Sequence, residues 1–146
     1  KGTVYRQTMF AEFELRMAEL SAQGVTLTAE VLCEEYRKLN ALYYGDDVVL
    51  DDEIALEWAR IPHFFYNFYV FQYATGFSAA VAIANRILTE GKPAVEDYIK
   101  FLSAGSSMDP ISVLKIAGVD MTTAQPVNDA LKLFNELIDE MAALAE

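Results

Sequence analysis

One long stretch without formal charge does most to constrain how this chain folds. Between Arg60 and Arg86, 25 consecutive residues carry no charge when His63 is neutral, and eight aromatic rings lie from Phe64 to Phe77. That length would permit a membrane span. Polar side chains interrupt the apolar run, however, and no basic cluster flanks it at either end. We therefore expect a central helix that is apolar nearly all round, inside a soluble helical protein without a membrane partner.

The remainder of the chain shows helical periodicity from end to end. Apolar side chains recur at the spacing of one helix face, and no alternating strand pattern persists beyond three or four residues. Thr28 and Asp109 are predicted as N-caps, Pro110 suits a first helical turn, and glycines mark several helix ends. The expected helices span about residues 3–23, 28–45, 61–86, 93–104, 110–118 and 126–145. The last of them has apolar side chains on one side and charged side chains on the other, and we expect it to be an ordinary packing helix. This pattern predicts an all-α fold, a multi-helix bundle of about six helices, in a single domain over residues 1–146.

Charge and cysteine content exclude several classes of function. The chain has 22 acidic and 11 basic side chains, a formal charge of -11, and no cluster of Lys or Arg. Such a balance argues against nucleic acid as a partner, because phosphate binding depends on basic patches. The single Cys33 excludes an intramolecular disulfide and a cysteine-based zinc site. A reducing compartment fits this composition, and we expect a cytoplasmic location.

Two polar segments invite a ligand interpretation, and each also has a simpler one. Carboxylates are dense over residues 46–53, but their spacing lacks the alternating ligands and the central glycine of a calcium loop. Gly105 lies among serines before a helix, without the glycine spacing and the lysine of a phosphate-binding loop. We interpret the acidic segment as a solvated loop and a helix N-terminus, where the helix dipole favours acids, and the Gly105 segment as a connecting loop. We expect no metal ligand in either.

The best candidate for chemistry is His63 with the tyrosines that follow it. On a helical wheel of 100° per residue, Tyr66, Tyr69 and Tyr73 share one face with His63 over about 15 Å. The opposite face, expected to meet the core, carries plain rings: Phe64, Phe68 and Phe71. Two interpretations stay open. The polar tips are satisfied inside a core, or they line a cleft as hydrogen-bond donors that stabilise a developing oxyanion.

Three segments carry a resemblance to a known family. Residues 6–14 read RQTMFAEFE, residues 61–76 read IPHFFYNFYVFQYATG, and residues 114–121 read LKIAGVDM. These segments resemble the C-terminal region of the oligoendopeptidase F group, zinc metallopeptidases of the thimet oligopeptidase family. The resemblance extends over essentially the whole chain.

The resemblance implies a mostly helical enzyme with a deep channel that admits only short peptides. In that family, two histidines of an HExxH helix and a glutamate on a following helix hold the zinc, and the HExxH glutamate activates water. None of these elements occurs in this sequence. We therefore expect the C-terminal portion of a larger enzyme that binds no zinc and is inactive on its own. Faces normally covered by the rest of the enzyme predict self-association of such a fragment.

The resemblance also implies roles for the candidate residues. In the family, a histidine followed by tyrosines binds the substrate backbone and stabilises the tetrahedral intermediate. His63, Tyr69 and Tyr73 correspond to the catalytic members of that set, and Tyr66 joins them in substrate binding. A further tyrosine of thimet oligopeptidase falls at Gly76 here, so the phenol that donates to the oxyanion stays open, and Tyr66 is one alternative. The competing hypothesis is a self-contained helical module that binds a peptide or an apolar ligand.

Overall fold

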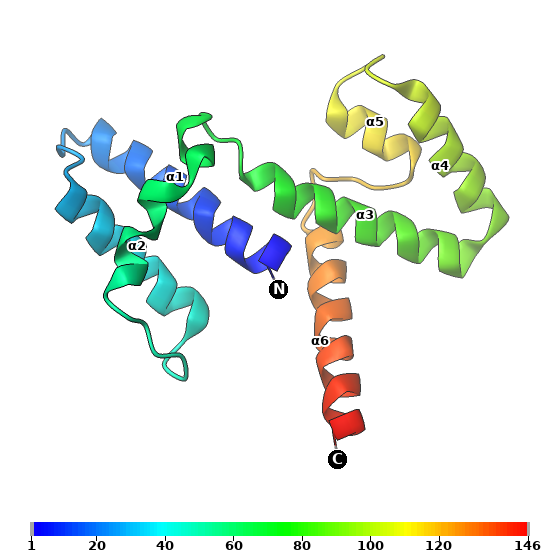
Figure 1. Cartoon of the computed structure of the whole chain (residues 1–146). Helices are drawn as coiled ribbons and strands as arrows, with labels where there is room; N and C mark the ends of the chain where they lie inside the picture. Colours follow the sequence, from blue (N-terminus) through cyan, green and yellow to red (C-terminus); the bar gives the residue numbers. More distant parts are fainter. Residues whose placement is uncertain (1, 146) are drawn as a thin grey trace. The chain divides into compact units, whose positions relative to one another are not determined.

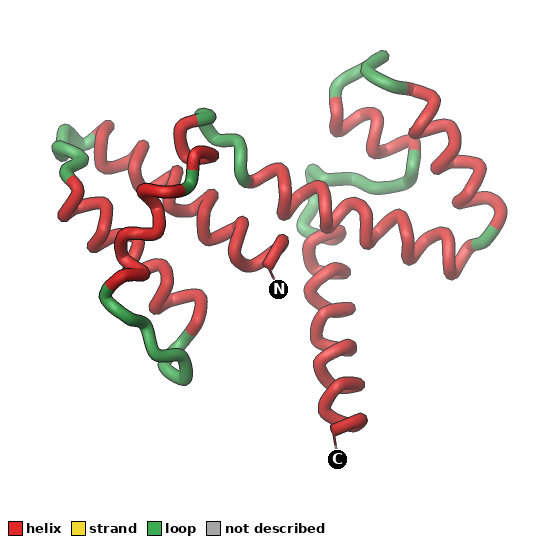
Figure 2. Tube along the Cα trace, in the orientation of Figure 1, coloured by secondary structure: helices red, strands yellow, loops and turns green. Residues whose placement is uncertain are grey.

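The computed structural model describes residues 2–145, and every regular element in that part of the chain is helical (Figure 2). The prediction of an all-α fold with about six helices is confirmed. The six α-helices are α1 (Gln7–Ala22), α2 (Ala29–Tyr44), α3 (Phe71–Glu90), α4 (Lys92–Ala104), α5 (Pro110–Ile116) and α6 (Gln125–Ala145). A π-helical turn, η1 (Gly2–Arg6), precedes α1, and two 3-10 segments, η2 (Glu53–Arg60) and η3 (Pro62–Phe65), lie between α2 and α3.

The chain divides into two compact units, Lys1–Ala74 and Thr75–Glu146. In the first unit, α1 and α2 lie side by side and η2 packs on α2 (Figure 1). Their apolar faces enclose one core of buried side chains: Met9, Phe10, Phe13, Leu32, Tyr36, Leu39, Ile61 and Val70. A single domain over the whole chain stays a prediction.

The predicted helix caps are confirmed where the sequence marks them most clearly. The Thr28 hydroxyl accepts a hydrogen bond from the backbone N–H of Val31 at the start of α2. The Asp109 carboxylate accepts one from the backbone N–H of Ser112, and Pro110 opens α5. Both contacts satisfy backbone donors that a helix leaves free in its first turn.

The prediction of one continuous helix over residues 61–86 is wrong in its first part. After η3 the backbone is irregular, and α3 begins only at Phe71. Asn67 and Phe68 have φ angles of 52° and 59°, in the left-handed region. Residues of a right-handed α-helix have negative φ angles. Positive φ angles are uncommon for a bulky L-residue such as Phe, because they cost conformational free energy. Periodicity detects the recurrence of apolar side chains, and it does not detect a reversal of backbone handedness.

The apolar stripe of α6 does not form the ordinary packing face that its periodicity predicts. Of the residues in α6, only Pro126 and Ala130 are buried. The stripe beyond them is largely exposed, with exposed fractions of 41% for Leu133, 48% for Leu137, 46% for Ile138, 72% for Met141 and 88% for Leu144. Within residues 2–145, no helix has both the length and the apolar character that crossing a bilayer requires.

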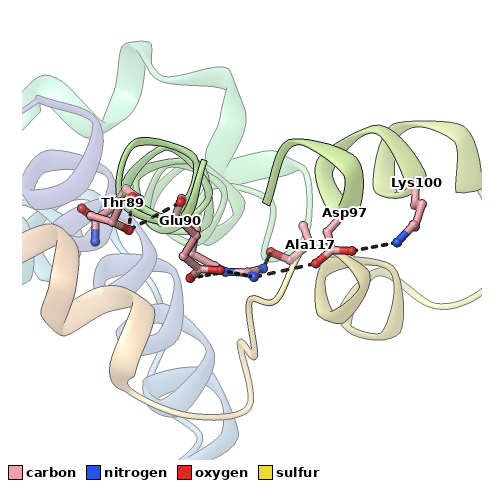
Figure 3. Close-up of polar contacts among 7 residues, drawn as sticks. Thr89, Glu90, Asp97, Lys100 and Ala117 are labelled. Carbon is pink, nitrogen blue, oxygen red and sulfur yellow. Dashed lines mark hydrogen bonds and ion pairs between the residues drawn. The ribbon is translucent and has the colours of Figure 1, made fainter. Parts of the chain in front are cut away.

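In the second unit, α4 and α5 pack together, and a polar network is centred on Arg86 of α3 (Figure 3). The Arg86 guanidinium donates to both carboxylate oxygens of Glu90, at 2.9 Å from Nε and 2.7 Å from Nη2. Its Nη1 donates to the carbonyl oxygen of Ala117, just beyond α5, at 2.5 Å. The hydrogen bonds that Arg86 donates to Glu90 raise the pKa of Arg86 and lower the pKa of Glu90. Arg86 thereby ties the end of α5 to α3.

Gly118 follows this contact and is restricted in two ways. Its φ is +76°, and a Cβ at this position would overlap the Arg86 guanidinium. We expect Gly118→Ala to cost about 1–2 kcal/mol for the left-handed backbone and about 1.5–3 kcal/mol more for the displaced bond from Arg86. Chemical denaturation of the 146-residue chain measures the loss.

Gly24→Ala is the matched control for that substitution, because Gly24 also ends a helix at a positive φ, +80°, with the same pattern of backbone hydrogen bonds as Gly118. A Cβ at Gly24 would meet nothing within 4 Å. Gly24→Ala should therefore show the backbone cost alone. Equal losses for the two variants would mean that the Arg86 contact contributes nothing to stability.

Candidate active site

His63 lies in η3 and is half-buried among tyrosine rings. The ring of Tyr69 stacks on the imidazole at 5.7 Å between centroids and 13° between planes. Tyr66 and Tyr73 meet the imidazole edge-on, at 5.7 Å and 6.1 Å. The structure thus brings together all four side chains that the sequence singles out, and all four belong to the first unit. Their catalytic role stays a prediction.

The phenols of this cluster are available as hydrogen-bond donors. The Tyr73 hydroxyl donates to the Tyr69 hydroxyl at 3.2 Å, and this bond raises the pKa of Tyr73. Tyr66, Tyr69 and Tyr73 are 57%, 36% and 37% exposed. A phenol with a raised pKa stays protonated at neutral pH, so it keeps a proton to donate. Of the two open interpretations, the exposure favours hydrogen-bond donors at a surface over satisfied core residues.

The four rings gather through a turn, not through the helix face that the sequence predicts. The left-handed pair Asn67 and Phe68 lies between Tyr66 and Tyr69 and redirects the backbone there. Phe68 and Phe71, expected to face the core, are 45% and 48% exposed. The prediction of a core-facing position for these two rings is therefore wrong.

Of the three phenylalanines predicted to face the core, Phe64 does pack into it. Its centroid lies 5.2 Å from that of Phe10, 5.1 Å from that of Phe13 and 6.5 Å from that of Tyr36, all with edge-on geometry. Phe64 follows His63 directly. The core of α1 and α2 therefore anchors the turn that carries the imidazole.

The sequence did not predict a polar network that lies in the segment before this turn. The Glu57 carboxylate of η2 accepts hydrogen bonds from Arg6 at 2.5 Å, from Tyr36 at 2.7 Å and from Arg60. Its side chain is only 9% exposed. These donors come from η1, α2 and η2, so no local spacing in the sequence predicts their meeting.

The charges of this network are stabilised by one another. Burial by itself would raise the pKa of Glu57, but the hydrogen bonds from Tyr36 and Arg6 outweigh burial and lower it. Burial and the bond to Glu57 raise the pKa of the Tyr36 phenol. At neutral pH the network is an ionised carboxylate held by two guanidinium groups and a neutral phenol.

The residues present do not fit a metal centre. Among residues 2–145, no group of three or more His, Cys, Asp or Glu side chains is placed so that it could hold a metal ion. Cys33 is half-buried, and its sulfur accepts a hydrogen bond from the Trp58 indole at 3.4 Å. In the acidic segment, the Asp51 carboxylate accepts from the backbone N–H of Ile54, close to the start of η2. We assign no metal-binding role to any residue of this chain.

Comparison with known proteins decides the family. The model of Peptidase family M3 matches residues 1–133. The chain belongs to peptidase family M3. Oligopeptidase PepF of Bacillus subtilis is 58% identical to this chain of family M3 over 144 residues, which are 99% of the chain and 22% of the relative. The chromosomal oligoendopeptidase F of Lactococcus lactis subsp. cremoris is 47% identical over 146 residues, which are 100% of the chain and 24% of that relative.

Two solved structures share the fold. The crystal structure of oligoendopeptidase-F from Enterococcus faecium has a TM-score of 0.95 at 53% identity, over 99% of this chain and 28% of that one. The crystal structure of a putative peptidase from Chlamydophila abortus has a TM-score of 0.89 at 40% identity, over 98% of this chain and 24% of that one. The chain therefore spans about a quarter of the length of the relatives that it matches.

Proposed function

We propose that this chain is the substrate-binding C-terminal portion of a zinc-dependent oligoendopeptidase that hydrolyses short peptides. Membership of peptidase family M3 and the names of the relatives support the peptidase class. The observation that carries the role of this portion is the cluster of His63 with Tyr66, Tyr69 and Tyr73, whose rings meet at an accessible surface.

The cluster offers N–H and O–H donors to a bound peptide. When the scissile carbonyl carbon becomes tetrahedral, its oxygen gains negative charge, and hydrogen bonds to that oxygen strengthen. The imidazole of His63 and the phenol of Tyr73 are the donors that we assign to this oxygen and to the adjacent substrate backbone. Because the bonds are stronger in the transition state than in the bound substrate, they raise turnover more than they raise affinity.

The Tyr69 hydroxyl has a preparatory part in this proposal. It accepts a hydrogen bond from the Tyr73 hydroxyl at 3.2 Å, and the Tyr69 ring stacks on His63. A substrate oxygen can replace the Tyr69 hydroxyl as the acceptor of this hydrogen bond, while the Tyr69 ring stays in contact with the imidazole. The Tyr66 ring lies nearly perpendicular to the imidazole, 5.7 Å away between centroids, and completes the proposed binding surface.

The zinc in this proposal belongs to polypeptide outside the chain, since no described residues here fit a metal centre. The cytoplasmic location stays part of the proposal. Self-association of the isolated chain also stays a prediction, for which the exposed apolar stripe of α6 is the physical reason.

A comparison of two polypeptides tests the proposed function. The 146-residue chain and the longer polypeptide that contains it are assayed with a quenched fluorescent peptide and analysed for bound zinc. We expect hydrolysis and stoichiometric zinc only in the longer polypeptide. Hydrolysis by the 146-residue chain, with stoichiometric zinc bound to it, would overturn the proposal.

A further inference from the structure

We propose that Glu57 is a positioning residue for His63, and this inference rests on the proposed function. Glu57 lies in η2, the segment that leads into the turn carrying the imidazole. Its carboxylate joins η2 to α2 through Tyr36, and to η1, which leads directly into α1, through Arg6. The chain between Glu57 and His63 is therefore held at its beginning by a nearly buried charge.

The same short stretch is held again at its far end. Ile61 is 6% exposed, and the ring of Phe64 sits edge-on to the rings of Phe10 and Phe13. The residue that links the two anchors is Tyr36, whose hydroxyl binds Glu57 and whose ring lies 6.5 Å from that of Phe64. His63 lies between a polar anchor and an apolar anchor, and its own ring contacts are with the tyrosines.

This arrangement gives Glu57 an effect on catalysis without contact with substrate. A hydrogen-bond donor stabilises a transition state only when it is held in the right place, and a displacement of about 1 Å costs about 10²-fold in rate. Loss of the Glu57 carboxylate releases Arg6, Arg60 and the Tyr36 hydroxyl together, so only the apolar anchor continues to hold the turn. The backbone hydrogen bonds of the 3-10 segment η2 have poorer geometry than those of an α-helix, so they are a weak replacement for that anchor.

The test uses Glu57→Ala in the enzyme that contains this chain. We expect kcat to fall about tenfold, less than for a full 1 Å displacement, with KM changed less than about twofold and zinc content unchanged. The decisive measurement repeats the substitution in a His63→Ala background. If Glu57 acts through the imidazole, its removal there lowers kcat no further.

Glu12→Ala is the matched control. The Glu12 carboxylate accepts a hydrogen bond from Tyr43 at 2.8 Å and so also joins α1 to α2, but it does not contact η2. Its removal should leave kcat within about twofold of the wild type, since it breaks a similar bond without releasing the turn. A second variant, Tyr36→Phe, keeps the core ring and removes a single donor to Glu57. Its kcat should fall about threefold, and this fall should also vanish in the His63→Ala background.

The outcomes separate this inference from the proposed function. If His63→Ala alone keeps wild-type turnover, the proposed function fails and the inference fails with it. If His63→Ala lowers turnover while Glu57→Ala and Tyr36→Phe have no effect, only the inference is overturned. The inference is also overturned if these two substitutions lower kcat equally in the presence and absence of His63, or if Glu12→Ala lowers kcat as much as they do. Should Glu57→Ala fail to fold, Tyr36→Phe decides by the same criteria.

Discussion

Replacing His63 by Ala in the enzyme that contains this chain lowers turnover about 10²- to 10³-fold, the cost of one donor to a developing oxyanion. The imidazole contacts all three tyrosine rings, with Tyr69 stacked on it and Tyr66 and Tyr73 nearly perpendicular to it. Its truncation removes one donor and the surface on which the phenols are packed. Steady-state hydrolysis of a fluorescent peptide measures the effect, and zinc analysis of the same preparation should show no change.

Tyr73→Phe is the finer version of this experiment. It removes only the hydroxyl that donates to Tyr69 at 3.2 Å and leaves the ring in contact with His63. We expect a fall in kcat of the same order, about 10²-fold, with KM little changed. Phe65→Tyr is a control in the same segment, because Phe65 is 74% exposed and makes no contact that the account uses. Wild-type turnover in both His63→Ala and Tyr73→Phe would show that these two residues have a structural role and no catalytic one.

Truncation of Phe13 should have the largest effect on stability. This ring is completely buried and lies edge-on to Tyr36 at 5.0 Å and to Phe64 at 5.1 Å. A buried Phe replaced by Ala costs about 3–5 kcal/mol, because apolar contact is lost and a cavity remains. We expect this cost to appear as faster hydrogen exchange throughout α1 and α2, the helices that share the core.

Phe65→Ala makes the same chemical change at an exposed position. Its ring is 74% exposed, so we expect a change below about 0.5 kcal/mol, typical of surface substitutions. Hydrogen exchange measured by mass spectrometry on the 146-residue chain reports both variants in the same peptides. Similar exchange in the two variants would show that Phe13 is not the centre of this core.

The helices that could be predicted are those whose determinants are local. Thr28 and Asp109 cap the helices that follow them, and Pro110 opens α5, because side-chain to backbone contacts within three residues fix these boundaries. The all-α class followed from periodicity for the same reason. The stretch from Ile61 to Val70 could not be predicted in this way, since the left-handed angles of Asn67 and Phe68 depend on tertiary contacts of their neighbours.

For the candidate site, the sequence predicted the members but not the geometry. His63 and its three tyrosines were selected on a helical wheel, yet they meet through a turn with Phe64 held in the core. Glu57 could not be recognised, because Arg6 is 51 residues away in the chain and Tyr36 is 21 residues away. The stripe of α6 was predicted as a packing face, and periodicity alone does not say which surface covers such a face.

The most direct test of the central claim compares two inhibitors in the wild-type enzyme and in Tyr73→Phe. One is a phosphinic peptide whose tetrahedral phosphorus resembles the intermediate, and the other is a peptide of the same sequence that is not cleaved. If the Tyr73 phenol stabilises the transition state, the substitution lowers the affinity for the phosphinic peptide in proportion to the loss of kcat/KM. The affinity for the second inhibitor should stay nearly unchanged. An equal loss of affinity for both inhibitors, or no change in either affinity, would contradict a role of Tyr73 in stabilising the transition state.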